Sequence, residues 1–210
     1  MTEHMQPLEA IQDIKKMMER SSRFISLSGL SGVSAGICAL IGVWFAYQWI
    51  YKYYIRYEER GGYDALDFTK LTWNLIGLAI VIFAGAILSA LYFTWRKARR
   101  NKLPIWDHTS RKLIINLCIP IVAGGIFVFG MLHYSEWRFI TPVCLIFYGL
   151  ALVNASKYTL SDIRYVGLIE ITLGLINMWW IGYGLYFWAA GFGILHIVYG
   201  TLMWWKYDRS

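Results

Sequence analysis

Charged residues are scarce in this chain, and that scarcity is the first constraint on its class. Asp, Glu, Lys and Arg make up 16% of the 210 residues, whereas hydrophobic residues make up 58% and aromatic residues 18%. Soluble domains carry about 25% charged residues, so a water-soluble domain of this size is excluded. The composition instead predicts a polytopic membrane protein, with its charges confined to the ends of apolar helices.

Cysteine is also rare, and the motifs of common catalytic sites are missing. The three cysteines, Cys38, Cys118 and Cys144, all lie inside apolar runs, which argues against a disulfide framework. The sequence has no CxxC or Cys/His spacing, no HExxH, no phosphate-binding loop and no supported Ser/His/acid arrangement. We therefore expect no metal, no cofactor and no catalytic residue, and an enzymatic activity is unsupported.

The apolar residues are gathered into long runs that predict an all-α fold. Six transmembrane helices are expected at about 24–50, 71–95, 113–132, 139–154, 163–181 and 184–205. Only Ile181–Gly184 joins the last two runs, which leaves room for nothing but a tight antiparallel hairpin. We predict three antiparallel hairpins that form one transmembrane domain over residues 25–210.

Residues 1–24 precede this domain and differ from it in character. Apolar residues recur there every three or four positions, which predicts an amphipathic cytosolic or interfacial helix. The helix would either lie on the membrane surface or pack on the bundle.

The distribution of basic residues predicts the orientation of the chain. On one side of the six predicted spans the segments hold 4, 7, 2 and 2 Lys or Arg residues, and on the other side 4, 1 and 0. Fifteen against five places both termini in the cytoplasm by the positive-inside rule. The densest segment, residues 96–112, has seven basic residues and one acid, and we expect it to meet anionic lipid rather than nucleic acid.

Two further patterns concern the first half of the chain. Ser28, Gly32 and Gly36 recur at four-residue intervals and predict a close helix contact, either within the chain or in a dimer, with the former favoured. Residues 51–71 are rich in Tyr and balanced in charge, and predict an interfacial loop with a turn at Gly61–Gly62.

Glu170 is the one formal charge well inside an apolar run, where an unpaired carboxylate is costly. It lies six residues after Arg164, about 9 Å into its helix, and His196 lies ten residues before Lys206, about 15 Å from the same side. Neighbouring antiparallel helices would bring Glu170 and His196 together. Three asparagines extend this candidate ligand or proton site: Asn116 and Asn154 near the cytoplasmic ends of their spans, and Asn177 on the same helix face as Glu170.

Two interpretations of this polar cluster stay open. It could be a pocket that exchanges a proton, binds a cation or holds a polar head group. It could equally be a set of hydrogen-bonded helix contacts, with Glu170 neutral because burial disfavours the charged carboxylate.

Three functions follow from these two interpretations. The best supported is a small-solute or proton-handling, transporter-like protein that uses the inner-half polar cluster. The alternative is a non-catalytic membrane scaffold or regulatory subunit that docks a protein partner, or forms a homo-oligomer. Its docking surface would be the basic segment together with the helix expected at 1–24. A lipid-acting membrane enzyme is less favoured, since it requires a head group bound near the cluster.

Several stretches of the sequence carry a resemblance to a known group of proteins. They are SRFISLSGLSGVSAGICALIG (22–42), YFTWRKARR (92–100), IWDHTSRKLIINL (105–117), ASKYTLSDIRYVGLIEITLGL (155–175) and GFGILHIVYGTLMWWKY (191–207). The chain resembles, over most of its length, a family of small six-span inner-membrane proteins of Bacteroidota. The resemblance implies a multi-pass protein of the bacterial inner (cytoplasmic) membrane. That family has no established activity, so it offers no site residues to transfer.

Overall fold

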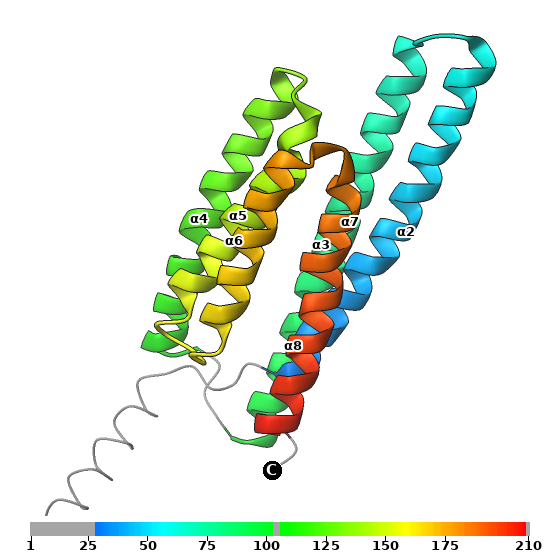
Figure 1. Cartoon of the computed structure of the whole chain (residues 1–210). Helices are drawn as coiled ribbons and strands as arrows, with labels where there is room; N and C mark the ends of the chain where they lie inside the picture. Colours follow the sequence, from blue (N-terminus) through cyan, green and yellow to red (C-terminus); the bar gives the residue numbers. More distant parts are fainter. Residues whose placement is uncertain (1–27, 103–105, 209–210) are drawn as a thin grey trace, which may run out of the picture.

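The computed structural model describes residues 28–102 and 106–208, and in this part of the chain helices are joined by short turns without any strand. The helix expected at 1–24 lies outside the described residues. Five long helices come first in chain order: α2 (Gly29–Arg60), α3 (Ala65–Arg100), α4 (His108–His133), α5 (Ile140–Ala155) and α6 (Ile163–Trp179) (Figure 1). A 3₁₀ turn, η1 (Trp137–Phe139), leads directly into α5.

The chain ends in one continuous helix, here called the last helix, in which four segments follow one another. They are α7 (Gly184–Trp188), η3 (Ala189–Leu195), α8 (His196–Met203) and η4 (Trp204–Asp208), and a 3₁₀ turn, η2 (Ile181–Tyr183), precedes them. Both η3 and η4 are π-helical. Such wider turns are rare inside α-helices and recur at functional sites. The π-helical segment η3 leads directly into His196.

Five of these helices are long and apolar enough to cross a membrane: α2, α3, α4, the unit formed by η1 and α5, and the last helix with η2. At 17 residues, α6 is at the lower limit of what spans a hydrocarbon core of about 30 Å. The predicted all-α class is thereby confirmed, and the helices have the length and apolar composition that membrane spans require.

The first two helices are longer than the sequence suggested. Most of the loop expected at 51–71 is helical, because α2 has 32 residues and α3 has 36. At 1.5 Å per residue they are about 48 and 54 Å long, well beyond the hydrocarbon thickness. The expected turn is confirmed at Gly61, whose φ of 70° is the left-handed conformation that glycine adopts without strain.

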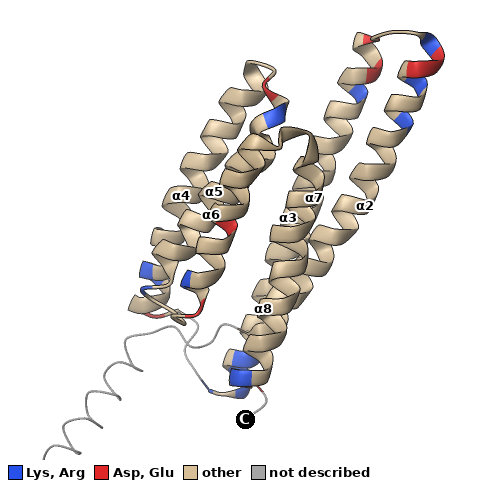
Figure 2. Ribbon diagram, in the orientation of Figure 1, with Lys and Arg blue, Asp and Glu red and all other residues tan. Residues whose placement is uncertain are grey.

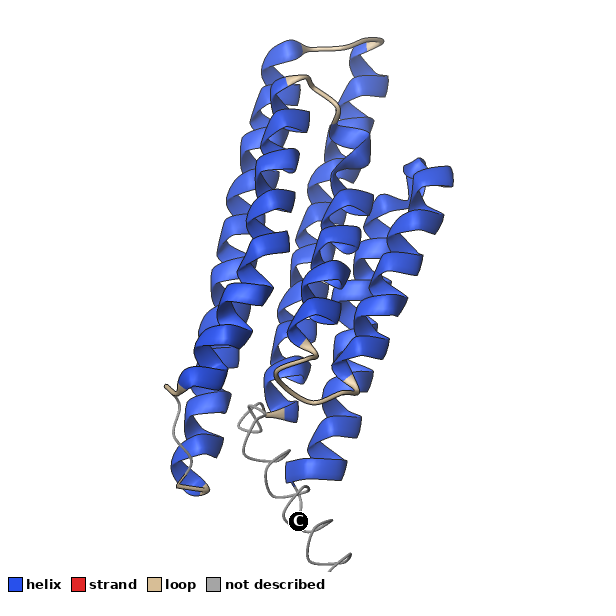
Figure 3. Ribbon diagram, turned by 90° about the vertical axis from the view of Figure 1, so that its left-hand side faces the viewer, coloured by secondary structure: helices blue, strands red, loops and turns tan. Residues whose placement is uncertain are grey.

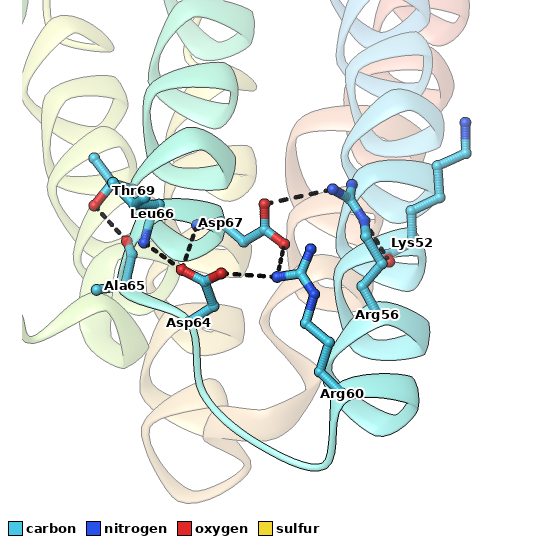
Figure 4. Close-up of polar contacts among 8 residues, drawn as sticks. All are labelled: Lys52, Arg56, Arg60, Asp64, Ala65, Leu66, Asp67 and Thr69. Carbon is cyan, nitrogen blue, oxygen red and sulfur yellow. Dashed lines mark hydrogen bonds and ion pairs between the residues drawn. The ribbon is translucent and has the colours of Figure 1, made fainter.

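Ion pairs fix the geometry on both sides of this turn (Figure 4). Arg60 Nη1 lies 2.8 Å from Asp64 Oδ2 and 2.5 Å from Asp67 Oδ2, and Arg56 Nη1 lies 3.5 Å from Asp67 Oδ1. Asp64 also caps α3, since its Oδ1 accepts a hydrogen bond of 2.8 Å from the Leu66 amide. The Arg60–Asp64 pair is about half exposed on both sides, whereas the Asp67 side chain is only 12% exposed. A pair exposed like Arg60–Asp64 is worth at most about 1 kcal/mol, so it orders the tip rather than holds the fold together.

The helices pack as two groups of three, which lie side by side in Figure 1. Figure 3, turned by 90°, shows the described residues as helices joined by short loops, with no strand. In one group α5 lies between α4 and α6, and in the other α2 lies between α3 and the last helix. The two groups meet where α5 and α6 contact α7 and η3. The site described below is located at this junction.

Glycines let the helices of each group approach backbone to backbone. A Cβ added to Gly32 would lie 3.1 Å from the Cα of Gly200, and one added to Gly36 would lie 2.7 Å from the carbonyl oxygen of Gly193. The predicted small-residue stripe of α2 is therefore confirmed as a contact within the chain, against the last helix.

Lys and Arg residues lie at both ends of the bundle (Figure 2), but they outnumber Asp and Glu only at the end where α3 ends and α4 and α6 begin. We call this the basic end. It carries Arg96, Lys97, Arg99 and Arg100 at the end of α3, and Arg111 and Lys112 in the first turns of α4.

Candidate functional site

Glu170 of α6 is completely buried at the junction of the two helix groups. Its carboxyl group faces η3 at a point where no side chain intervenes, because a Cβ added to Gly191 would lie 2.5 Å from Glu170 Oε2. The same added atom would lie 2.6 Å from Leu145 Cδ2 of α5, a residue that is also fully buried. Three helices therefore enclose the carboxyl group, and the absence of a side chain at Gly191 makes the enclosure sterically allowed.

His196, the first residue of α8, lies beside Glu170. Its Nδ1 is 3.5 Å from Glu170 Oε1 and 3.0 Å from the carbonyl oxygen of Gly191. Its Nε2 is 2.7 Å from the hydroxyl oxygen of Tyr148 of α5. The structure thus brings Glu170 and His196 together, as their positions along antiparallel helices led us to expect, and adds Tyr148 as a third member.

The hydrogen bonds of His196 determine where its protons can be. The Gly191 carbonyl can only accept, so Nδ1 must carry a proton in this bond. In a neutral imidazole, Nε2 then accepts a hydrogen bond from the Tyr148 hydroxyl, and in an imidazolium it donates one to the same oxygen. Tyr148 can therefore serve both protonation states of His196 by rotating its hydroxyl group.

Glu170, in contrast, is short of hydrogen-bond donors. Among the described residues neither carboxyl oxygen has a hydrogen-bond partner, and the imidazole Nδ1–H is already bonded to Gly191. A proton can reside on the carboxyl group with His196 neutral, or on the imidazole with Glu170 ionised, and both states have zero net charge. An Nδ1 atom that already carries a proton cannot accept a second one, so direct transfer over the 3.5 Å between Glu170 Oε1 and Nδ1 uses the neutral tautomer whose single proton is on Nε2 and donated to Tyr148. Transfer from Glu170 then gives the imidazolium, whose Nδ1–H can donate to Gly191.

Aromatic rings surround this pair of titratable groups. The Phe192 ring centroid lies 5.2 Å from that of Tyr148 and 6.2 Å from that of His196, and Trp188 packs 4.6 Å from Phe192 on the other side. An apolar shell lowers the local dielectric, so an unpaired carboxylate inside it is strongly disfavoured and couples strongly to any nearby charge.

Asn116 and Asn154 lie away from this site and connect α4 to α5. The side chain of Asn154 donates a hydrogen bond of 2.9 Å to the backbone carbonyl of Asn116, and the side chain of Asn116 bonds the carbonyl of Lys112 one turn earlier in its own helix. Both residues are thus used at the contact between α4 and α5, whereas Glu170 lies where α5 and α6 meet the last helix. The expected four-helix polar cluster is therefore divided between two helix contacts.

Asn177 is also apart from Glu170. It is fully buried, and its side-chain amide donates a hydrogen bond of 2.9 Å to the carbonyl of Trp180, the C-cap residue that follows α6. Seven residues along a helix separate it from Glu170 by about 10 Å. Its role in the structure is to satisfy a free carbonyl at the helix terminus.

Sequence reasoning missed two members of the site, Tyr148 and Gly191. Tyrosine in membrane helices is concentrated at the interfaces, so a tyrosine more than two turns inside α5 was a usable signal. The carbonyl of Gly191 had no such signal, since its orientation toward His196 depends on the π-helical turns of η3.

A second polar cluster ties the end of the chain to the loop before α6. Lys206 Nζ lies 2.9 Å from Asp162 Oδ2, and the Tyr207 hydroxyl donates to the same oxygen over 3.2 Å. Lys206 and Tyr207 are both donors in these contacts, and the carboxylate of Asp162 accepts from both. These contacts hold the C-terminal part of the last helix, η4, against the beginning of α6.

No group of three or more His, Cys, Asp or Glu side chains that could hold a metal ion occurs within residues 28–102 and 106–208. Comparisons of the chain with protein-family models, with curated proteins and with solved structures find no match. The functional assignment below therefore depends on the geometry of the site.

Proposed function

We propose that this chain is a proton-handling, transporter-like protein of the bacterial inner membrane in which Glu170 takes up and releases a proton, with His196 and Tyr148 as its exchange partners. The observation that carries the proposal is the buried Glu170 carboxyl group, which lacks a hydrogen-bond partner among the described residues and has an imidazole nitrogen 3.5 Å away. Ionisable groups at membrane depth are costly, and they mark ion pathways and proton relays.

A proton fits this arrangement better than a metal cation does. Hard cations such as Ca²⁺ and Mg²⁺ require about six oxygen ligands, whereas the Glu170 carboxyl is the one acidic group here. The nearest polar atom, His196 Nδ1, carries a proton directed at Gly191 and beside Glu170 Oε1, which would repel a cation. A proton can instead pass between the carboxyl and the imidazole without additional ligands.

The orientation of the protein is part of the proposal. We propose three antiparallel hairpins with both termini in the cytoplasm, on the basis of the fifteen-to-five asymmetry in Lys and Arg. The basic end would then face the cytoplasm, with segment 96–112 near anionic lipid. Glu170 and His196 would be reached from that side, about 10 and 18 Å from the ends of their helices at 1.5 Å per residue.

Proton movement can be measured on the purified full chain in liposomes that contain a trapped pH-sensitive dye. With the membrane potential clamped by potassium and valinomycin, the wild type should dissipate an imposed pH gradient faster than empty liposomes. Glu170→Gln keeps the size of the side chain and removes the exchangeable proton. We expect it to lower the protein-dependent rate at least tenfold.

Glu136→Gln is the matched control, because it makes the same chemical change at a half-exposed carboxylate beside Arg138. It should leave the rate unchanged. Equal rates for wild type and Glu170→Gln, or a wild type that behaves like empty liposomes, would contradict the proposal and favour the scaffold or regulatory function.

A further inference from the structure

A pocket of about 260 Å³ opens at the basic end, remote from the Glu170 site. Its walls come from the beginning of α2, the end of α3 and the π-helical segment η4. None of the residues that form the proton site lines it, so its occupant is a separate question.

One wall of this pocket is cationic. Arg96 and Arg100 are four residues apart on α3, which places them on the same helix face, and both are exposed. Within residues 28–102 and 106–208 neither of them has an ion-pair partner. Lys97 also lines the pocket, but its ammonium group lies 2.6 Å from Asp208 Oδ1, so the two arginines supply the net positive charge.

The opposite part of the lining is apolar. Phe93 precedes Arg96 by one helical turn on α3, and Leu30 and Trp204 complete this surface. Along α3 the lining therefore changes from aromatic to cationic within three to seven residues, or about 5–10 Å. A bilayer changes from acyl chain to phosphate over a similar depth, and tryptophan is enriched at that level.

The floor of the pocket is held rigidly. The carboxylate of Asp208 accepts hydrogen bonds from the Ser28 hydroxyl at 2.9 Å and from the Gly29 amide at 3.0 Å, in addition to its pairing with Lys97. Asp208 thereby joins the end of the last helix to the beginning of α2. A preorganised floor reduces the entropy lost when a ligand binds.

From these features we propose that the pocket binds the head group of an anionic phospholipid. The phosphate lies between Arg96 and Arg100, which can each form paired hydrogen bonds to its oxygens, and the glycerol backbone and first methylenes lie along Phe93 and Trp204. The volume is below the roughly 300 Å³ of ordinary small-molecule pockets, so it accommodates the head group and leaves the acyl chains in the bilayer.

Lipid-dependent thermal stability tests the proposal. The full chain, in an uncharged detergent, is titrated with phosphatidylglycerol, and its unfolding temperature is followed by tryptophan fluorescence. Phosphatidylglycerol should raise the unfolding temperature of the wild type to a plateau, and phosphatidylcholine should produce no such rise. In Arg96→Gln/Arg100→Gln the phosphatidylglycerol concentration at half-effect should increase about thirtyfold, as expected for the loss of two interfacial charges.

The control is Arg111→Gln/Lys112→Gln, which removes two exposed charges from the basic end outside the pocket. It should keep the wild-type midpoint. The proposal is overturned if both double variants weaken the stabilisation by phosphatidylglycerol equally, because the lipid would then respond to the total charge of the basic end rather than to the pocket. It is overturned, too, if phosphatidylcholine stabilises the protein as phosphatidylglycerol does. It is also overturned if inorganic phosphate alone stabilises the wild type at the same midpoint, because the ligand would then be a free anion.

Discussion

At the scale of single residues, the site is defined by what each group can donate. Gly191 supplies a carbonyl that only accepts, His196 supplies a proton at Nδ1, and Tyr148 can act as donor or acceptor at Nε2. Glu170 is the member without a hydrogen-bond partner among the described residues. Its carboxyl group is therefore the one whose protonation state depends most on what reaches the site.

Removal of one hydroxyl group tests the role of Tyr148. In Tyr148→Phe the Nε2 atom of His196 loses its 2.7 Å partner and remains buried. We expect the free energy of unfolding to fall by about 1–3 kcal/mol, the cost of an unsatisfied buried polar atom. Thermal unfolding in detergent, with circular dichroism as the readout, measures the change.

Tyr199→Phe on the last helix is the control for that experiment. Its hydroxyl is buried and has no hydrogen-bond partner within the described residues, so its removal should be neutral or slightly stabilising. If both phenylalanine variants lose the same stability, the hydrogen bond between Tyr148 and His196 does not hold the site.

At the scale of elements, close helix packing positions the site. The last helix carries His196 and Gly191, and glycine contacts hold it against α2. Gly149 of α5 and Gly167 of α6 make an equivalent contact, since a Cβ at either position would lie 2.6 Å from the other's carbonyl oxygen. The distance between Glu170 and His196 thus depends on two close helix contacts, that of α2 with the last helix and that of α5 with α6. Neither pair of helices can separate without losing this packing.

A single methyl group at the first of these contacts should be costly. A Cβ on Gly200 would lie 2.5 Å from the Val33 amide nitrogen and 2.6 Å from the Gly29 carbonyl oxygen, both of them backbone atoms. We expect Gly200→Ala to lower the free energy of unfolding by about 1–3 kcal/mol. The measurement is the unfolding temperature in detergent.

Gly130→Ala in α4 makes the same change where no atom lies within 4 Å of the added Cβ. It should be neutral or stabilising by up to about 1 kcal/mol, because alanine favours the helix. A similar loss at both positions would show that the contact between α2 and the last helix is looser than described.

Apolar runs predicted the helices well but not where they end. A run of apolar residues predicts only the part of a helix that would lie in the hydrocarbon core. The helix α2 continues beyond its apolar run to Arg60, because Tyr and charged residues are compatible with a helix in water. The glycine turn did mark the real end, since Gly61 needs a left-handed conformation.

The candidate site was predictable in part for a similar reason. Glu170 and His196 stand out because charge and imidazole are costly in an apolar run, and depth alone placed them at compatible levels. Asn116 and Asn154 were expected at a similar depth, but depth does not determine which helices are neighbours. Asn116 and Asn154 lie instead at the interface between α4 and α5, because α4 packs against α5.

At the scale of the whole molecule, the turn between α2 and α3 and the basic end lie at opposite ends of the bundle (Figure 2). Cysteine labelling can establish which end faces the cytoplasm. In a variant without the native cysteines, Tyr63→Cys and Asn101→Cys place single thiols at exposed positions, one at each end. A membrane-impermeant thiol reagent should label Tyr63→Cys in intact spheroplasts and Asn101→Cys only after lysis.

The reverse pattern of labelling would mean that the positive-inside rule fails for this chain. The Glu170 site would then open toward the opposite side of the membrane. Labelling of both positions in intact spheroplasts would contradict a single orientation.

The proposal that Glu170 exchanges a proton is tested most directly by the thermal stability of the purified protein across pH, for wild type and Glu170→Gln. We predict that the wild type shows a pH-dependent step in unfolding temperature, and that Glu170→Gln is at least as stable but lacks this step, because Gln cannot titrate. If Glu170→Gln instead unfolds at a lower temperature at every pH, with the pH dependence of the wild type retained, the carboxyl group is a structural contact between helices and the proposed function is wrong.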